Sequence, residues 1–211
     1  MQYTYSAENH DWDLTLRAAW GLLMTGQAAK YVKIPGIGDV AEREFASYLG
    51  SMLLSFCAIE SFSASVAFSM PKTDQFKDFD FQKYRRSLRF WDKIDLLFGA
   101  IPHPLDKSQG LFQLIVEMQN WRNLVAHSSP YEIESTPIAD TTREPPRLHG
   151  PFKDKEYARS VDLNNAKKFY LAAVQFIELL TKLTGIDPRA SATYTPIDTN
   201  ISKSLVEDSK L

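Results

Sequence analysis

An arginine, an asparagine and a histidine stand close together near the end of one predicted helix, at Arg122, Asn123 and His127. The apolar residues before them recur at steps of three and four, and Pro130 follows directly, so we expect them in the last two turns of an amphipathic helix. An imidazole titrates near neutral pH and a guanidinium keeps its charge, so these groups can move a proton and hold an anion.

Helix geometry limits how these three side chains can meet. At about 100° per residue, Asn123 and His127 lie about 40° apart and share a face, whereas Arg122 and His127 lie about 140° apart. Arg122 therefore reaches the same site only through its long side chain, through helix distortion near Pro130, or from a second protomer. The alternative is structural, because Arg and His at a helix C-terminus also complement the helix dipole and Asn123 can satisfy a buried polar contact.

Five other residues are candidates for supporting roles. Glu60 is the single charged residue in the apolar stretch from Phe45 to Met70, so it needs a partner if it is buried, and Arg122 is the partner we expect. A partly exposed glutamate is the alternative. Four cations are predicted to form a phosphate-facing patch: Arg85, Arg86, Arg89 and Lys93. The alternative is that they lie on a merely solvated helix face.

Periodic apolar patterns between proline and glycine breaks predict five helices. They are expected at about 11–31, 40–70, 81–98, 106–127 and 163–183, with Leu88 on the buried stripe of the third. Asn9 or Asp11, Asp106 and Asp162 are the expected N-caps. This pattern predicts an all-α fold, an up-and-down bundle of four or five helices. It forms a single domain over 1–185 with a polar, proline-rich insertion at about 131–159, followed by a C-terminal tail over 186–211.

The region from Phe45 to Met70 is long enough to span a bilayer. Six of its seven serines fall in two rows four residues apart, which form stripes of small side chains where another helix can approach closely. We therefore expect a buried central helix and no membrane contact. The N-terminus has no signal-peptide pattern and Cys57 is the only cysteine, which fits a cytoplasmic protein. A net charge of −2 confines any nucleic-acid contact to a local patch.

The segment from Arg122 to His127 resembles the motif of the HEPN superfamily (higher eukaryote and prokaryote nucleotide-binding domains). That motif is an arginine, often followed by a polar residue, and then a histidine after four to six intervening positions. The order of helices is similar as well, and the resemblance covers roughly residues 11 to 183. Arg143 and His149 also fit the spacing, but they lie in the proline-rich insertion.

The resemblance implies a metal-independent endoribonuclease that needs no cofactor. The ribose 2′-hydroxyl would attack the adjacent phosphorus, with His127 as general base or acid, Arg122 on the phosphate and Asn123 orienting the histidine or a phosphate oxygen. It also implies a homodimer with both motifs in one cleft, in toxin–antitoxin or antiphage systems that include an antitoxin or regulatory protein. The alternative function is a non-catalytic RNA- or nucleotide-binding protein, or a dimeric scaffold or regulator. The scattered histidines lack metal-ligand spacing, so no metal site is predicted.

Overall fold

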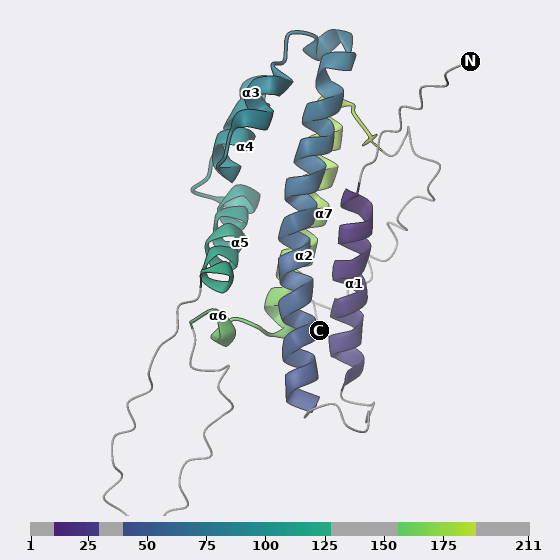
Figure 1. Ribbon diagram of the computed structural model, residues 1–211, viewed down its shortest axis with the longest axis vertical. Coiled ribbons are helices and arrows are strands. Elements are labelled where there is room, and N and C mark those ends of the chain that lie inside the picture. The colour runs from purple at the N-terminus through teal and green to yellow at the C-terminus, as the bar shows by residue number, and fades with distance from the viewer. Residues whose placement is uncertain (1–10, 30–39, 128–155, 189–211) are drawn as a thin grey trace, which may run out of the picture.

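The computed structural model describes residues 11–29, 40–127 and 156–188, and these contain helices and no strand (Figure 1). The α-helices are α1 (Trp12–Ala28), α2 (Val40–Ser69), α3 (Phe81–Arg86), α4 (Phe90–Gly99), α5 (Gly110–Ala126), α6 (Glu156–Arg159) and α7 (Leu163–Thr184). Two short 3-10 helices, Met70–Lys72 and Asp74–Phe76, follow α2. The predicted all-α fold is confirmed.

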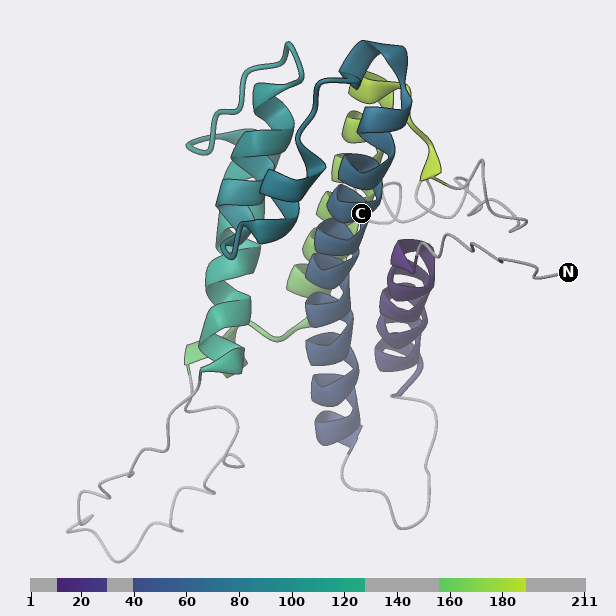
Figure 2. The ribbon, with the colours of Figure 1, turned by 45° about the horizontal axis from the view of Figure 1, so that its top comes forward.

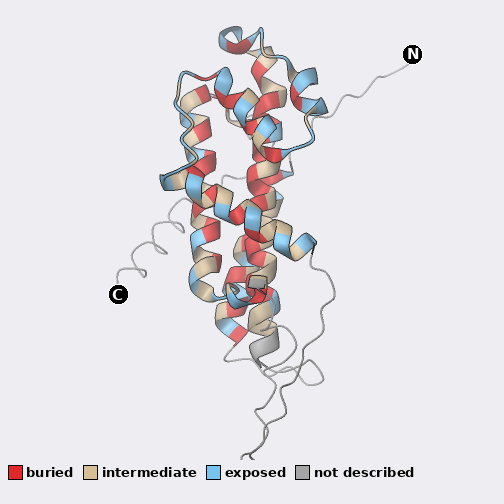
Figure 3. Ribbon diagram, turned by 90° about the vertical axis from the view of Figure 1, so that its left-hand side faces the viewer, coloured by how far each residue is buried: buried red, intermediate tan, exposed pale blue. Residues whose placement is uncertain are grey.

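The centre of the bundle is α2, whose 30 residues span about 45 Å. It runs opposite to α1, which lies on one side, while α3, α4 and α5 lie on its other side and α7 lies behind (Figures 1 and 2). Of these, α4 runs in the same direction as α2, and α5 runs back in the opposite direction, since Phe98 near the end of α4 contacts Phe112 near the start of α5. The direction alternates along α1, α2, α5 and α7, as in an up-and-down bundle. Buried residues of α2, among them Phe56, Ile59 and Phe62, form the core that these helices share (Figure 3).

Close approach between α1 and α2 depends on glycine. A Cβ atom at Gly26 would overlap the ring of Tyr48, and one at Gly50 would lie 2.7 Å from a methyl carbon of Leu22. The two helices therefore pack closer together at these points than larger residues would permit.

By length and composition, α2 is the one helix of the described ranges that could cross a membrane, and 61% of its most apolar window is buried inside the bundle. Ser51, Ser55 and Ser63 on this helix are buried. The hydroxyls of Ser55 and Ser63 donate to the carbonyls of Ser51 and Ile59, at 2.8 and 2.7 Å, so these two hydroxyls are satisfied within α2 itself, whereas the Ser51 hydroxyl has no hydrogen-bond partner among the described residues. The core helix of a globular bundle has these properties.

The single helix predicted over 81–98 is wrong, because the chain breaks into α3 and α4. Ser87 and Arg89 have extended backbones, with ψ of 128° and 142°, and Leu88 between them is 96% exposed rather than buried. The break lets Tyr84 and Phe90 both reach the core. On one continuous helix, Leu88 would have occupied the buried stripe.

Other helix ends confirm or correct the sequence interpretation. As expected, Asp162 caps α7 by accepting a hydrogen bond from the Asn165 N–H at 2.7 Å. Gly185 ends that helix with φ of +67°. Asp106 does not cap α5, which begins at Gly110. Its carboxylate instead accepts hydrogen bonds from Ser108 and Gln109. Asp11 occupies the N-cap position of α1 without a side-chain cap bond, and Asn9 lies outside the described residues. The predicted insertion is described only at its end, where α6 forms.

Candidate functional site

The last two turns of α5 are fixed in the bundle by a tryptophan. The indole Nε1–H of Trp121 donates to the carbonyl oxygen of Tyr157 at 3.0 Å, and its ring meets Phe169 of α7 edge-on, 5.5 Å between centroids. Because Trp121 is anchored on one side, the residue after it is turned toward α2.

Arg122 contacts α2 through both its charge and its flat face. Its Nη2 lies 3.0 Å from Oε1 of Glu60, and its guanidinium carbon lies 5.1 Å from the centroid of the Phe56 ring. The Arg122 side chain is 29% exposed and that of Glu60 is 39% exposed. The pairing of Glu60 with Arg122 that the sequence led us to expect is therefore confirmed, and Glu60 is also partly exposed.

Burial opposes ionisation around this ion pair. It raises the pKa of the Glu60 carboxyl, although the charges of Arg122 and Lys93 and the hydrogen bond from Arg122 act to lower that pKa. Burial, and then the charge of Glu60, also raise the pKa of the Tyr84 hydroxyl and of the Cys57 thiol. The effect of burial on the pKa of Glu60 therefore outweighs the effect of its cations. The two cations do not fully offset the cost of removing the Glu60 carboxylate from water.

His127 lies at the C-cap of α5, directly after the last helical residue. Its side chain is exposed, and its backbone N–H donates to the carbonyl of Asn123 at 2.9 Å. Asn123 is half-buried. Within the described residues, no hydrogen bond or ion pair joins Arg122 to His127. The chain thus holds both groups at one helix end, with Arg122 engaged by α2 and His127 open to solvent.

The four predicted phosphate-facing cations do not lie on one helix. Lys93 on α4 is half-buried, 5.7 Å from the Tyr84 ring centroid, and interacts electrostatically with Glu60. Arg85, Arg86 and Arg89 are exposed and lie before or within the break that separates α3 from α4. The spacing along one helix that grouped them in the sequence does not exist in the structure.

No family model, curated protein or solved structure matches this chain. The HEPN resemblance therefore rests on the motif and on the helix order alone. No group of three His, Cys, Asp or Glu in the described ranges could hold a metal ion. Arg143 and His149, which repeat the motif spacing, lie outside those ranges.

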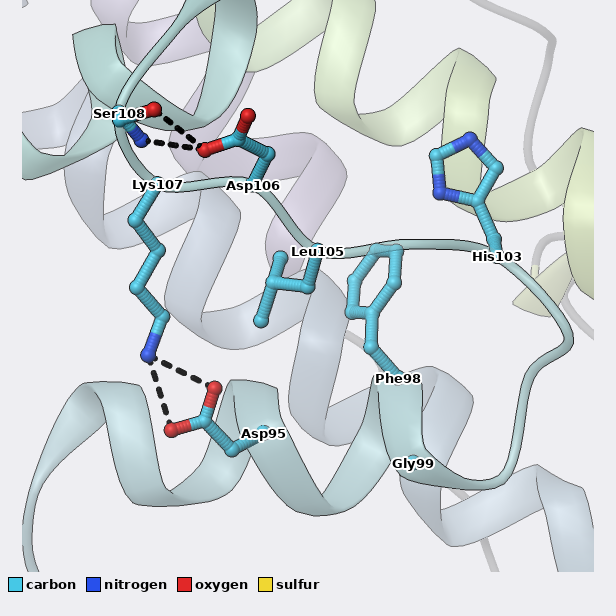
Figure 4. Close-up of a pocket in the computed structure, with 8 residues that line it drawn as sticks. All are labelled: Asp95, Phe98, Gly99, His103, Leu105, Asp106, Lys107 and Ser108. Atoms are coloured by element: carbon cyan, nitrogen blue, oxygen red, sulfur yellow. Dashed lines mark hydrogen bonds and ion pairs between the residues drawn. The ribbon is translucent and has the colours of Figure 1, made fainter.

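The sequence interpretation missed an open hollow of about 580 Å³ between the end of α4 and the start of α5 (Figure 4). Its polar groups mostly bond to one another, since Lys107 pairs with Asp95 at 2.7 Å and Ser108 donates to Asp106. Nδ1 of His103 is enclosed there without a hydrogen-bond partner. The sequence signal was the Pro-His-Pro at 102–104, which lies in a break between two of the predicted helices.

Proposed function

We propose that the C-terminal end of α5 binds RNA and cleaves it without a metal ion, the activity that the HEPN resemblance implies. The supporting observation is that Arg122 is held by Glu60 at 3.0 Å while 29% of its side chain stays exposed, and that an exposed His127 follows on the same helix end. A guanidinium fixed in this way keeps free N–H donors for a phosphate oxygen.

In this proposal each group has a separate task. Glu60 positions Arg122, whose remaining donors would bind the scissile phosphate and stabilise the charge that grows on its oxygens. His127 would accept the proton of the ribose 2′-hydroxyl as that oxygen forms a bond to phosphorus, while the bond to the 5′-oxygen breaks. The leaving oxygen takes a proton from a second acid, for which the histidine of a second copy is the group we propose. The products are a 2′,3′-cyclic phosphate and a 5′-hydroxyl.

A dimer would also place an arginine and a histidine beside each other, which one chain does not do. Because no contact joins Arg122 to His127 in the part of the chain described, a second copy set against α5 would complete a cleft with the motifs of both. Leu124, on the same turn, is 42% exposed and could be covered in such a contact.

The test is cleavage of a fluorescent single-stranded RNA by the purified full chain in the presence of a chelator. We expect cleavage that His127→Ala and Arg122→Ala abolish, with products carrying the cyclic phosphate. His103→Ala and Lys168→Ala are matched controls, since they remove a histidine and an ion-paired cation from other places. RNA that stays intact, or activity unchanged in both motif variants, would contradict the proposal.

A second candidate is a non-catalytic dimeric scaffold or regulator. It is favoured by the fact that Arg122 is already paired with Glu60 and stacked on Phe56, as a purely structural arginine would be. In that case Arg122→Ala lowers the free energy of unfolding or the dimer fraction, and neither variant changes the RNA. Both properties can be measured on the same preparations.

A further inference from the structure

The turn between α3 and α4 exposes a leucine among arginines. Leu88 is 96% exposed, the highest value among the large hydrophobic residues that the structure describes. Arg85 and Arg86, in the last turn of α3, and Arg89, at the N-cap of α4, are exposed as well. We call these four residues the arginine–leucine turn. A leucine so fully exposed contributes nothing to the core, so the fold does not account for it.

The three arginines keep their charge available. None of their guanidinium groups forms a hydrogen bond or an ion pair with the rest of the described chain, whereas other cations contact a carboxylate, as Arg17, Lys107 and Lys168 do. Residues 83–93 include five Lys or Arg and a single acidic residue, Asp92, in a chain whose net charge is −2. The turn is therefore a local cationic surface on an anionic protein.

We propose, in place of the sequence-based expectation of no membrane contact, that the arginine–leucine turn docks on the surface of an anionic lipid bilayer without spanning it. Cations near such a surface gain from its negative potential, and an apolar side chain beside them gains by entering the interface. RNA would bind the arginines but offers an aliphatic leucine little, and a protein partner would need a fitted pocket with an acidic rim. Salt screens repulsion between the bilayer and the more distant acidic residues of the chain, because the Debye length is about 8 Å at physiological salt.

The contributions of the arginines and of Leu88 to bilayer binding can be measured separately. Each arginine near the surface is worth about a fivefold change in the partition coefficient, so removing all three should weaken binding by about a hundredfold. Removing the apolar side chain of Leu88 should weaken it by about tenfold. This proposal does not depend on the ribonuclease activity proposed for the end of α5.

The test is co-sedimentation of the full chain at 0.15 M salt with phosphatidylcholine vesicles that contain or lack phosphatidylserine. The variants are Leu88→Ser and the triple change Arg85→Gln, Arg86→Gln and Arg89→Gln, with folding checked by circular dichroism. We expect binding only to vesicles with phosphatidylserine, and a loss in both variants.

Matched controls remove the same groups elsewhere. Leu14→Ser takes a 56% exposed leucine from α1, and three changes on α7 remove an equal charge: Lys167→Gln, Lys168→Gln and Lys182→Gln. Both should bind as the parent does. Docking is refuted if the parent ignores phosphatidylserine, or if the α7 controls lose as much binding as the turn variants. It is also refuted if the triple arginine variant loses affinity for a 20-nucleotide RNA while vesicle binding is absent, since the turn would then be a nucleic-acid contact.

Discussion

The pair between Arg122 and Glu60 should have a coupling energy clearly larger than that of an exposed pair. At about 4 Å and an effective dielectric constant of about 20, two unit charges attract by about 4 kcal/mol before screening by nearby solvent is considered. Water at the partly exposed ends of both side chains screens much of this attraction. With side chains 29% and 39% exposed, we expect a net coupling of about 1–2 kcal/mol.

A double-mutant cycle measures this coupling free of other losses. Arg122→Ala also removes packing on the Phe56 ring, but that loss cancels in the cycle with Glu60→Ala. Urea unfolding of the parent, both single variants and the double variant gives the coupling directly. The control cycle uses Lys168 and Glu117, whose nitrogen and oxygen lie 2.9 Å apart with side chains 49% and 48% exposed.

The nitrogen–oxygen distance in the control pair is nearly the same, but its side chains are about half again as exposed to solvent. We therefore expect a coupling energy of no more than about 0.2–1 kcal/mol for it. The reasoning is refuted if the two cycles give equal coupling energies. It is also refuted if the losses from Arg122→Ala and Glu60→Ala simply add.

Three further predictions concern stability. Because burial raises the folded pKa of Glu60, the native state binds more protons than the unfolded one from about pH 4.5 upward, and the free energy of unfolding falls as pH rises through that window. Glu60→Gln should make the urea midpoint less dependent on pH between 4 and 7. If the midpoint changes with pH as steeply as in the parent, Glu60 is not the cause of the dependence. Gly185→Ala should lower the free energy of unfolding by about 1 kcal/mol, because the φ of Gly185 is +67°. Gly99 has open space around it and no positive φ, so Gly99→Ala should stabilise α4 by a few tenths of a kcal/mol. Equal shifts in melting temperature for the two variants would refute this contrast. Asp162→Ala should cost about 1 kcal/mol by removing the cap of α7, seen as a lower melting temperature that Asp162→Ser largely restores.

The long helices were predictable because local signals and tertiary packing agree there. The bounds of α2 and α7 follow from their apolar periodicity, from Pro71 after the first and from Asp162 and Gly185 around the second. The break at Leu88 was not predictable, because apolar spacing continues through it. Only the need of Tyr84 and Phe90 to reach one core explains it, and that need is set by residues distant in sequence.

The candidate site was predictable in part, because there too a local sequence signal agrees with the tertiary packing. A lone glutamate in an apolar helix requires a cation, and the nearest suitable one by pattern, Arg122, is the one found. The relation between Arg122 and His127 was not predictable, because at 140° apart on an ideal helix it depends on how the end of α5 meets its surroundings.

The bond from Trp121 to Tyr157 has a consequence for how this chain can vary. It ties the end of α5 to α6, so the chain departs after His127 and returns at Glu156 close to one fixed point. Closing a connection between anchored ends costs only about 0.6 kcal/mol more for each doubling of its length. Insertions and deletions between these two points should therefore cost the helical bundle little stability.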